Sequence, residues 1–466
     1  MNGKDLEKAL LWEAPHIGEK APEQIPEAQD FCEGYKTFLN EGKTERECVK
    51  KAVTLLENAG YQKFDPKASY KAGDKIYWNN RKKAIIASTI GTKDLNEGLR
   101  MNGAHIDSPR LDLKPNPLFE KDEIAYLKPH YYGGIRKYQW GTVPLSMHGV
   151  VVKADGEVVE ISIGENEGDP QFCVTDLLPH LASEQNGRKL AEGLKGEELN
   201  IIIGSIPYHD EENEKIKNPA KLLAMKLLNE RYGITEKDFT RAEIEMVPAY
   251  KAVDIGLDRG LVGAYGQDDR VCAYTALMAE IGTKNPEHTT FTILTDKEEI
   301  GSVGNTGLHS DYVHHAVEDL AESFGADTKT VLRHSICLSS DVNAAYDPTF
   351  ASVYESRNSS YVNKGCVLTK YTGARGKSGS SDASAETMAK VIGIMEENGV
   401  YWQTGELGAV DAGGGGTIAY IPAKYGMDVI DSGVPVLSMH SPWEVTSKAD
   451  IYEARRGYEA FLRAEG

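Results

Sequence analysis

The first part of the chain contains two helix-like patterns of apolar residues, followed by two strand-like segments. Over residues 27–39 and 44–59 apolar residues recur every three or four positions, which predicts two amphipathic helices. Gly60 follows the second helix as a typical stop signal. Residues 84–90 and 99–104 are then expected to form strands of an inner sheet.

The middle of the chain has a different pattern of apolar and polar residues. Short β-like runs alternate with glycine-containing and charged turns, at residues 150–152, 158–163, 200–206 and 241–246. One helix is expected over residues 220–232, where Gly233 ends the apolar pattern. We therefore expect a separate β-rich domain at residues 115–250.

Strands and helices alternate in the remainder of the chain. The pattern predicts helices at 270–282, 382–398 and 449–463 and strands at 291–295, 335–338 and 434–437. Such alternation predicts an α/β fold with a mostly parallel sheet covered on both faces. The core would be discontinuous, formed by residues 1–114 and 251–466, with the β-rich domain inserted between them.

The composition narrows the classes of function. The 466 residues carry a formal net charge of −19, which repels nucleic acid, so no such partner is expected. No apolar stretch has the length of a membrane span or the form of a signal peptide, so we expect a cytoplasmic protein without a membrane partner. The six cysteines form no CxxC pair and are expected to be free thiols.

Side chains able to bind metal stand where the predicted elements begin or end. Two histidines and four carboxylates occupy such positions: His105, Asp268, Glu298, Glu299, Asp341 and His440. Because ligands of open α/β sheets gather at the carboxyl ends of the strands, we expect these side chains to meet at one sheet edge. Imidazoles together with carboxylates suit two divalent cations, zinc foremost, with manganese and cobalt as alternatives.

Each of these features, taken singly, has a commoner structural interpretation. A histidine at a strand end is usually a hydrogen-bonded structural residue. The pair Glu298 and Glu299 would usually be a solvated charge pair, and Asp268 with Asp269 a helix N-cap. The prediction of a metal site rests on five such features in succession, each at the end of an element.

The motifs around these residues resemble the aspartyl aminopeptidase family of metallo-aminopeptidases, and bacterial members in particular. The matching segments span nearly the whole chain: residues 105–114 (HIDSPRLDLK), 268–270 (DDR), 296–302 (DKEEIGS), 340–341 (SD), 413–418 (GGGGTI) and 437–441 (LSMHS). The resemblance implies a zinc-peptidase core of the phosphorylase/hydrolase-like type. It also implies that the inserted domain mediates dimerisation and that the dimers build a dodecamer.

The resemblance assigns the metal ligands. His105 and His440 would each bind one metal ion, and Asp268 would bridge the two ions. Glu299 and Asp341 would complete the two coordination spheres.

Four further residues are catalytic or substrate-binding by the same resemblance. Glu298 would be the general base that takes a proton from the attacking water and returns it to the leaving amine. Asp107 would hold the imidazole of His105, unless it only forms a turn. His180 matches a histidine that reaches into the active site of a neighbouring subunit; a structural role is the alternative. Lys370 matches a lysine near the substrate pocket and would pair with an acidic side chain, unless it is a surface lysine.

We therefore expect a metal-dependent aminopeptidase that removes N-terminal residues from peptides, with acidic N-termini preferred. Residues 343–347 read NAAYD where animal members carry histidines, which leaves a preference for neutral N-termini open. Two other functions are open as well. One is a two-metal amidohydrolase acting on a non-peptide amide. The other is a catalytically silent scaffold or cargo shell, against which the intact Glu298 argues.

Overall fold

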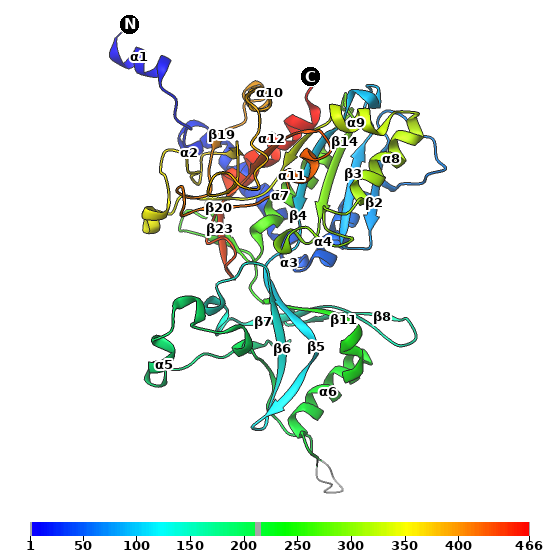
Figure 1. Cartoon of the computed structure of the whole chain (residues 1–466), viewed down its shortest axis with the longest axis vertical. Helices are drawn as coiled ribbons and strands as arrows, with labels where there is room; N and C mark the ends of the chain where they lie inside the picture. Colours follow the sequence, from blue (N-terminus) through cyan, green and yellow to red (C-terminus); the bar gives the residue numbers. More distant parts are fainter. Residues whose placement is uncertain (1, 210–215, 466) are drawn as a thin grey trace.

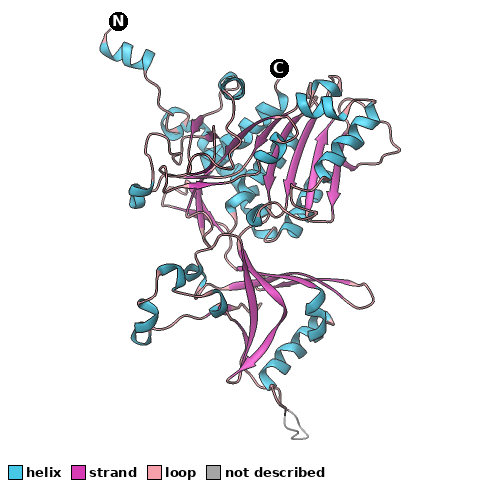
Figure 2. Cartoon of the chain, viewed as in Figure 1, coloured by secondary structure: helices cyan, strands magenta, loops and turns pink. Residues whose placement is uncertain are grey.

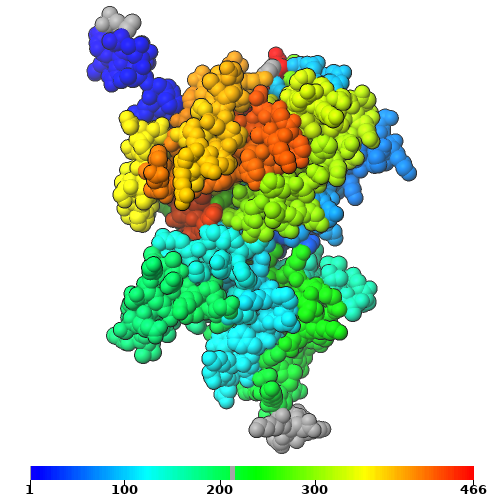
Figure 3. Space-filling view, in the orientation of Figure 1, coloured from blue at the N-terminus to red at the C-terminus, as the bar shows by residue number. Residues whose placement is uncertain are grey.

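A computed structural model describes residues 2–209 and 216–465 of the chain (Figure 1). The chain forms two lobes joined by a narrow waist. The larger lobe combines helices with a central sheet, and the smaller lobe is built around strands (Figure 2). The smaller lobe is the part coloured cyan to green in Figures 1 and 3. None of the helices in these two ranges is long and apolar enough to cross a membrane.

The larger lobe is built on a nine-stranded sheet with a parallel centre. Its strands, in spatial order, are β1 (Gln62–Lys63), β2 (Lys75–Asn80), β3 (Ala84–Thr89), β14 (Thr290–Thr295), β4 (Arg100–His105), β15 (Ile336–Ser339), β21 (Asp428–Gly433), β17 (Cys366–Thr369) and β19 (Trp402–Thr404). Strands β14, β4, β15 and β21 are parallel, whereas β3 and β17 beside them run antiparallel. The expected α/β class is confirmed.

Helices cover both faces of this sheet. One face packs against α3 (Ile25–Glu41), α4 (Glu45–Asn58), α7 (Gln267–Gly282), α10 (Ala385–Glu397) and α12 (Lys448–Arg463). The other face packs against α8 (Tyr312–Phe324), α9 (Thr328–His334) and α11 (Tyr420–Ala423). The short α1 (Gly3–Leu10) and α2 (Ile17–Lys20) lie near the N-terminus, and α1 projects from the lobe (Figure 1). Because helices cover both faces, every residue of β3, β4 and β14 is buried, without the alternation of a strand that has one exposed face.

One strand was expected in the wrong sheet. Residues 434–437 were predicted to belong to the main sheet, but β22 (Pro435–Leu437) lies in a separate five-stranded sheet. The position beside β15 is taken by β21 instead. The apolar pattern missed β21 because it contains the polar, yet buried, Asp431 and Ser432. The other strands of the five-stranded sheet are β12 (Val253–Ile255), β13 (Leu261–Ala264), β23 (Glu444–Ser447) and β16 (Asn343–Ala344).

The smaller lobe is a seven-stranded antiparallel sheet with its own apolar core. Its strands, in spatial order, are β8 (Val158–Ile163), β7 (Leu145–Val152), β11 (Ala242–Pro248), β5 (Arg110–Lys121), β6 (Ile124–Tyr132), β10 (Ile201–Gly204) and β9 (Cys173–Val174). Helices α5 (Ser183–Asn186) and α6 (Pro219–Tyr232) flank it, and α6 ends at Gly233 in the left-handed conformation. The sheet thus begins at Arg110, a few residues before the range 115–250.

The hairpin of β5 and β6 is the longest pair of strands in this sheet and was not expected. The sequence disguises it because prolines interrupt the apolar pattern at positions 115, 117 and 129. The structure accommodates the first two with a shift in register between Leu113 and Leu118.

All six cysteines are free, as expected.

Candidate metal centre

The candidate ligands converge on the carboxyl edge of the main sheet. His105 ends β4, and Glu298 and Glu299 follow β14, whose Thr295 pairs with His105. Asp341 follows the next parallel strand, β15. Parallel neighbouring strands therefore deliver these side chains to one place.

Two further candidate ligands come from outside the main sheet. Asp268 lies at the start of α7, next to the helix N-terminus. His440 follows β22 of the five-stranded sheet, with a backbone φ of +65°. A positive φ is uncommon for a residue other than glycine, and such conformations often occur at functional sites.

Asp268 stands between the two histidines. Its Oδ1 lies 3.1 Å from His105 Nε2 and its Oδ2 lies 3.0 Å from His440 Nε2. On one side, Asp341 Oδ1 is 3.8 Å from His105 Nε2. On the other side, Glu299 Oε1 is 3.4 Å from His440 Nε2. The cluster thus divides into a His105 half and a His440 half that share one carboxylate.

The cluster has the properties of a cation site. Asp268 Oδ1 and Glu299 Oε1 are buried and accept no hydrogen bond from any described residue. Burial raises the pKa of Glu298 to about 7 and raises the pKa of Glu299 and of Asp341 well above its usual range. A bound divalent cation would offset the repulsion among these carboxylates, and the mixture of imidazole and carboxylate suits zinc.

Asp107 links the His105 half to the backbone of the two glutamates. Its carbonyl oxygen lies 3.0 Å and its Oδ1 3.4 Å from His105 Nδ1. Its carboxylate accepts the backbone N–H groups of Glu298 and Glu299 at 3.1 and 3.2 Å, and the Tyr132 hydroxyl at 2.8 Å. This fully buried carboxylate therefore orients one imidazole and the segment that carries both glutamates.

The His440 half is held by residues that the sequence analysis did not single out. Glu444 accepts the backbone N–H groups of His440 at 2.8 Å and of Asp268 at 3.1 Å. His440 Nδ1 donates to the carbonyl oxygen of Gly134 at 2.9 Å. The double glycine at 133–134 was a usable signal, since glycine often marks a close approach of backbone to another group.

Two predicted residues lie apart from this cluster. His180 is exposed on the smaller lobe, in a short 3-10 helix, Pro179–Leu181. Lys370 Nζ donates to Asp382 Oδ1 at 2.7 Å and to the Ala383 carbonyl at 2.9 Å. Within the described ranges, neither side chain forms a hydrogen bond or ion pair with the seven residues of the cluster, namely His105, Asp107, Asp268, Glu298, Glu299, Asp341 and His440.

An α/β fold with imidazoles and carboxylates gathered at the carboxyl edge of its sheet is typical of metal-dependent hydrolases. Residues 38–462 match the family described as aminopeptidase I zinc metalloprotease (M18). The chain belongs to this family, whose members are hydrolases that act on the N-termini of peptides.

Relatives with similar sequences and structures span almost the whole chain. A probable M18 family aminopeptidase 1 of Clostridium acetobutylicum is 51% identical over 448 residues, which cover 94% of this chain and 96% of the relative. The crystal structure of an M18 aminopeptidase from Thermotoga maritima has a TM-score of 0.93 at 44% identity and covers 97% of this chain and 100% of its own. That of aminopeptidase I from Clostridium acetobutylicum has a TM-score of 0.92 at 49% identity, with coverage of 98% and 100%.

Proposed function

We propose that the chain removes N-terminal residues from peptides with the help of two divalent cations, foremost zinc. His105 and Asp341 would hold one cation, His440 and Glu299 the other, and Asp268 both. The observation that carries this proposal is the position of Asp268, whose two oxygens lie 3.1 and 3.0 Å from the two imidazoles. A carboxylate placed in this way suits a bridge between two cations.

Glu298 would act as the general base. Its carboxylate lies 3.8 Å from His105 Nε2 at the same cluster, while its backbone N–H is fixed by Asp107. Zinc, when bound, supplies Lewis acidity and lowers the pKa of water. Glu298 would take the proton of the attacking water and return it to the leaving amine. The neighbouring carboxylates would bind the free α-ammonium group, which limits cleavage to N-terminal residues.

The preferred N-terminal residue follows from the surroundings of Lys370. An acidic preference would require its ammonium group to pair with the substrate. A neutral preference is the second candidate, favoured by the ion pair that Lys370 already forms with Asp382 at 2.7 Å. We retain the acidic preference as the proposal because the resemblance includes this lysine.

We further propose that residues 115–250 mediate dimerisation and that His180 completes the site of a neighbouring subunit. Support comes from its position, since His180 is exposed among the exposed side chains of Leu177, Leu178 and Leu181. Exposed apolar clusters of this kind often mark contacts between proteins. A dodecamer would be built from such dimers.

The free cysteines favour a cytoplasmic location.

The decisive experiment combines metal analysis with a panel of aminoacyl chromogenic substrates. We expect about two zinc ions per chain, loss of activity on chelation and recovery with zinc, manganese or cobalt. Faster cleavage of aspartyl and glutamyl than of leucyl substrates would establish the acidic preference, and the opposite order the neutral one. Full activity in a thoroughly metal-stripped sample would refute the metal mechanism.

A further inference from the structure

The end of β6, in the smaller lobe, contacts both halves of the candidate metal centre of the same chain. The Tyr132 hydroxyl donates to Asp107 Oδ2 at 2.8 Å, on the side of the His105 half. Two residues later, the carbonyl oxygen of Gly134 accepts from His440 Nδ1 at 2.9 Å. One short segment of the antiparallel sheet therefore touches groups that orient both imidazoles.

Gly133, between these two contacts, packs against a third group of the centre. A Cβ atom at this position would lie 3.0 Å from Glu299 Oε2 and 3.3 Å from Glu299 Cβ. The backbone φ of Gly133 is +74°, which glycine adopts without strain. A side chain here would displace the Glu299 carboxylate, so the glycine sets how closely the segment approaches the His440 half.

Tyr132 acts on the centre through Asp107. Asp107 accepts the backbone N–H groups of Glu298 and Glu299 and contacts His105 Nδ1, as described above. Its Oδ2 receives both the Tyr132 hydroxyl and the Glu299 N–H. Without the hydroxyl, this buried carboxylate would lose a charge-assisted hydrogen bond and with it a fixed orientation.

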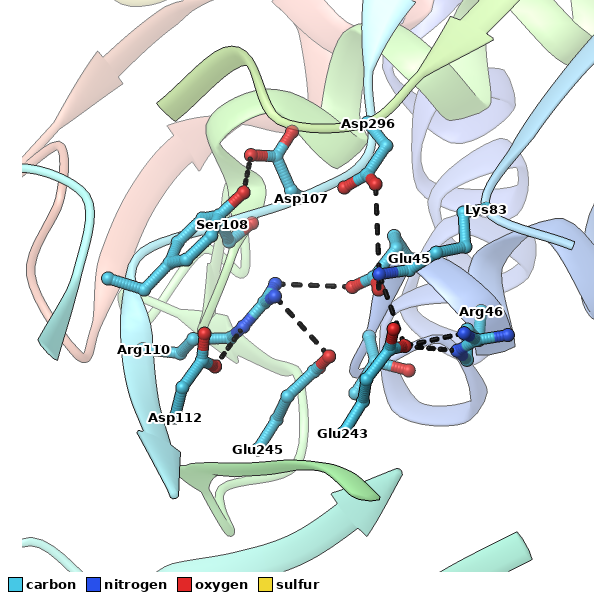
Figure 4. A network of polar contacts seen from close by, with 12 residues as sticks. Glu45, Arg46, Lys83, Asp107, Ser108, Arg110, Asp112, Glu243, Glu245 and Asp296 are labelled. Carbon is cyan, nitrogen blue, oxygen red and sulfur yellow. Dashed lines mark hydrogen bonds and ion pairs between the residues drawn. The ribbon is translucent and has the colours of Figure 1, made fainter. Parts of the chain in front are cut away.

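Arg110 in turn holds Tyr132 in place. Its guanidinium carbon lies 4.0 Å from the centroid of the Tyr132 ring. The same guanidinium pairs with Asp112 at 2.7 Å, Glu45 at 3.2 Å and Glu245 at 3.3 Å (Figure 4). Glu45 belongs to α4 of the larger lobe and Glu245 to β11 of the smaller one. The charge network thus joins the two lobes next to the ring of Tyr132.

Lys83 strengthens this junction. From the end of the β2–β3 hairpin turn it pairs with Glu45 at 3.0 Å and with Glu243 of β11 at 3.2 Å (Figure 4). Breaking one partner of a buried network leaves an uncompensated charge, so such networks resist partial opening. These ion pairs therefore link β5 and β11 to the larger lobe.

We propose that Tyr132 is a positioning residue through which the antiparallel sheet fixes the geometry of its own subunit's metal centre. This inference rests on the proposed two-metal function. It goes beyond the dimerisation expected of the smaller lobe, because it assigns that lobe a role inside each single chain. Metal retention then depends on how the smaller lobe sits against the larger one.

The test compares Tyr132→Phe with the neighbouring Tyr131→Phe. The first variant loses only the hydroxyl that Asp107 accepts, and the ring over Arg110 remains. Tyr131 lies on the same strand, is exposed, and its hydroxyl makes no hydrogen bond within the described ranges. We measure the Kd for zinc by competition with a chromogenic chelator, the Tm with and without zinc, and kcat and KM.

We expect the Kd of Tyr132→Phe for zinc to rise about tenfold, the lower end of the range for groups that orient metal ligands. The increase in Tm on adding zinc should shrink, and kcat should fall while KM stays near wild type. Tyr131→Phe should match wild type throughout. A purely structural role would lower the Tm of the zinc-free and zinc-loaded forms equally and leave Kd unchanged, and this result would overturn the inference. A wild-type protein that binds no zinc would instead refute the proposed function.

A second pair of variants tests the contact with Glu299. Gly133→Ala and Gly156→Ala both place a side chain at positive φ, +74° and +91°, but a Cβ on Gly156 meets nothing within 4 Å. Both variants thus strain the backbone at a positive φ, but only the first presses on the metal centre. We expect Gly133→Ala to bind zinc at least tenfold more weakly than Gly156→Ala. Equal zinc affinity of the two variants would contradict the inference.

Discussion

The two halves of the candidate metal centre are built in different ways. His105 ends a central strand, its side chain is 2% exposed, and the buried carboxylate of Asp107 orients it. His440 follows a short strand of another sheet, its side chain is 36% exposed, and a backbone carbonyl from the smaller lobe orients it. The first half belongs to the core of the fold, whereas the second depends on three sheets meeting correctly.

This difference shows how one fold can hold the His105 half rigidly and leave the His440 half easier to change. Residues on packed strands are held by the core itself, which is close-packed and resists deformation. Residues on loops depend on individual hydrogen bonds that can be changed without unfolding the protein. The two halves should therefore respond differently to mutation and to metal removal.

The largest expected effect separates the adjacent residues Glu298 and Glu299. Glu298→Gln should lower kcat by ~10²–10⁴-fold, because a general base is lost, while the zinc content remains near wild type. Glu299→Gln should instead lose the zinc ion of the His440 half. Turnover and zinc per chain are measured on the same preparations. The reverse pattern would show that the two roles are misassigned.

The second effect concerns His180, which belongs to neither the His105 half nor the His440 half. A catalytic role for it would show that the two halves alone do not make a complete site. If His180 serves a neighbouring subunit by donating a hydrogen bond to the oxyanion, His180→Ala should lower kcat by ~10²–10³-fold with metal and assembly intact. Mixing His180→Ala with Glu298→Gln subunits should then restore part of the activity, because some sites combine both intact groups. Exchanged mixtures that remain as inactive as their parents would exclude a shared site.

A third effect compares the carboxylates that orient the two halves. Asp107→Asn should weaken zinc binding by ~100-fold, because this carboxylate accepts two backbone N–H groups and lies beside His105. Glu444→Gln, in the His440 half, should weaken it by ~10-fold, since it accepts two backbone N–H groups and contacts no imidazole. Chelator competition gives both values. A larger effect for Glu444 would invert the comparison.

The smallest effect concerns the order in which the metal ions leave. Because His440 is partly exposed, brief treatment with a chelator should remove the zinc ion of its half first. Zinc released over time should therefore follow two phases of equal amplitude. His440→Ala should retain one zinc ion and show only the slow phase. A single phase in the wild type would mean that the two halves are equally accessible.

The sequence predicted that the segments carrying His105, Glu298 with Glu299, and Asp341 would meet, because each follows a recognisable strand. The apolar runs before His105, Glu298 and Asp341 form the parallel centre of the sheet, so their ends had to meet. The pattern also located α3, α4, α6, α7 and α12 to within a few residues. The roles of the individual ligands came from the resemblance of the motifs, not from periodicity.

Apart from Asp107, the groups that orient the candidate ligands were harder to predict. Tyr132 and Gly134 contact the centre because the β5–β6 hairpin places the end of β6 beside it. This hairpin was not expected, since prolines interrupt its apolar pattern. Glu444 follows His440 by four residues, but nothing in its spacing distinguishes it from a surface carboxylate. Such contacts between distant segments depend on tertiary packing, which local patterns do not encode.

The hydrogen bond between Gly134 and His440 has a consequence for biosynthesis, because its two residues are 306 positions apart in the chain. At the speed of a ribosome, roughly 5–20 residues per second, the partner of Gly134 appears about 15–60 s later. During this interval the nascent polypeptide carries His105 but no complete cluster. The chain therefore cannot complete its candidate metal centre until its last segment, with His440, has been translated.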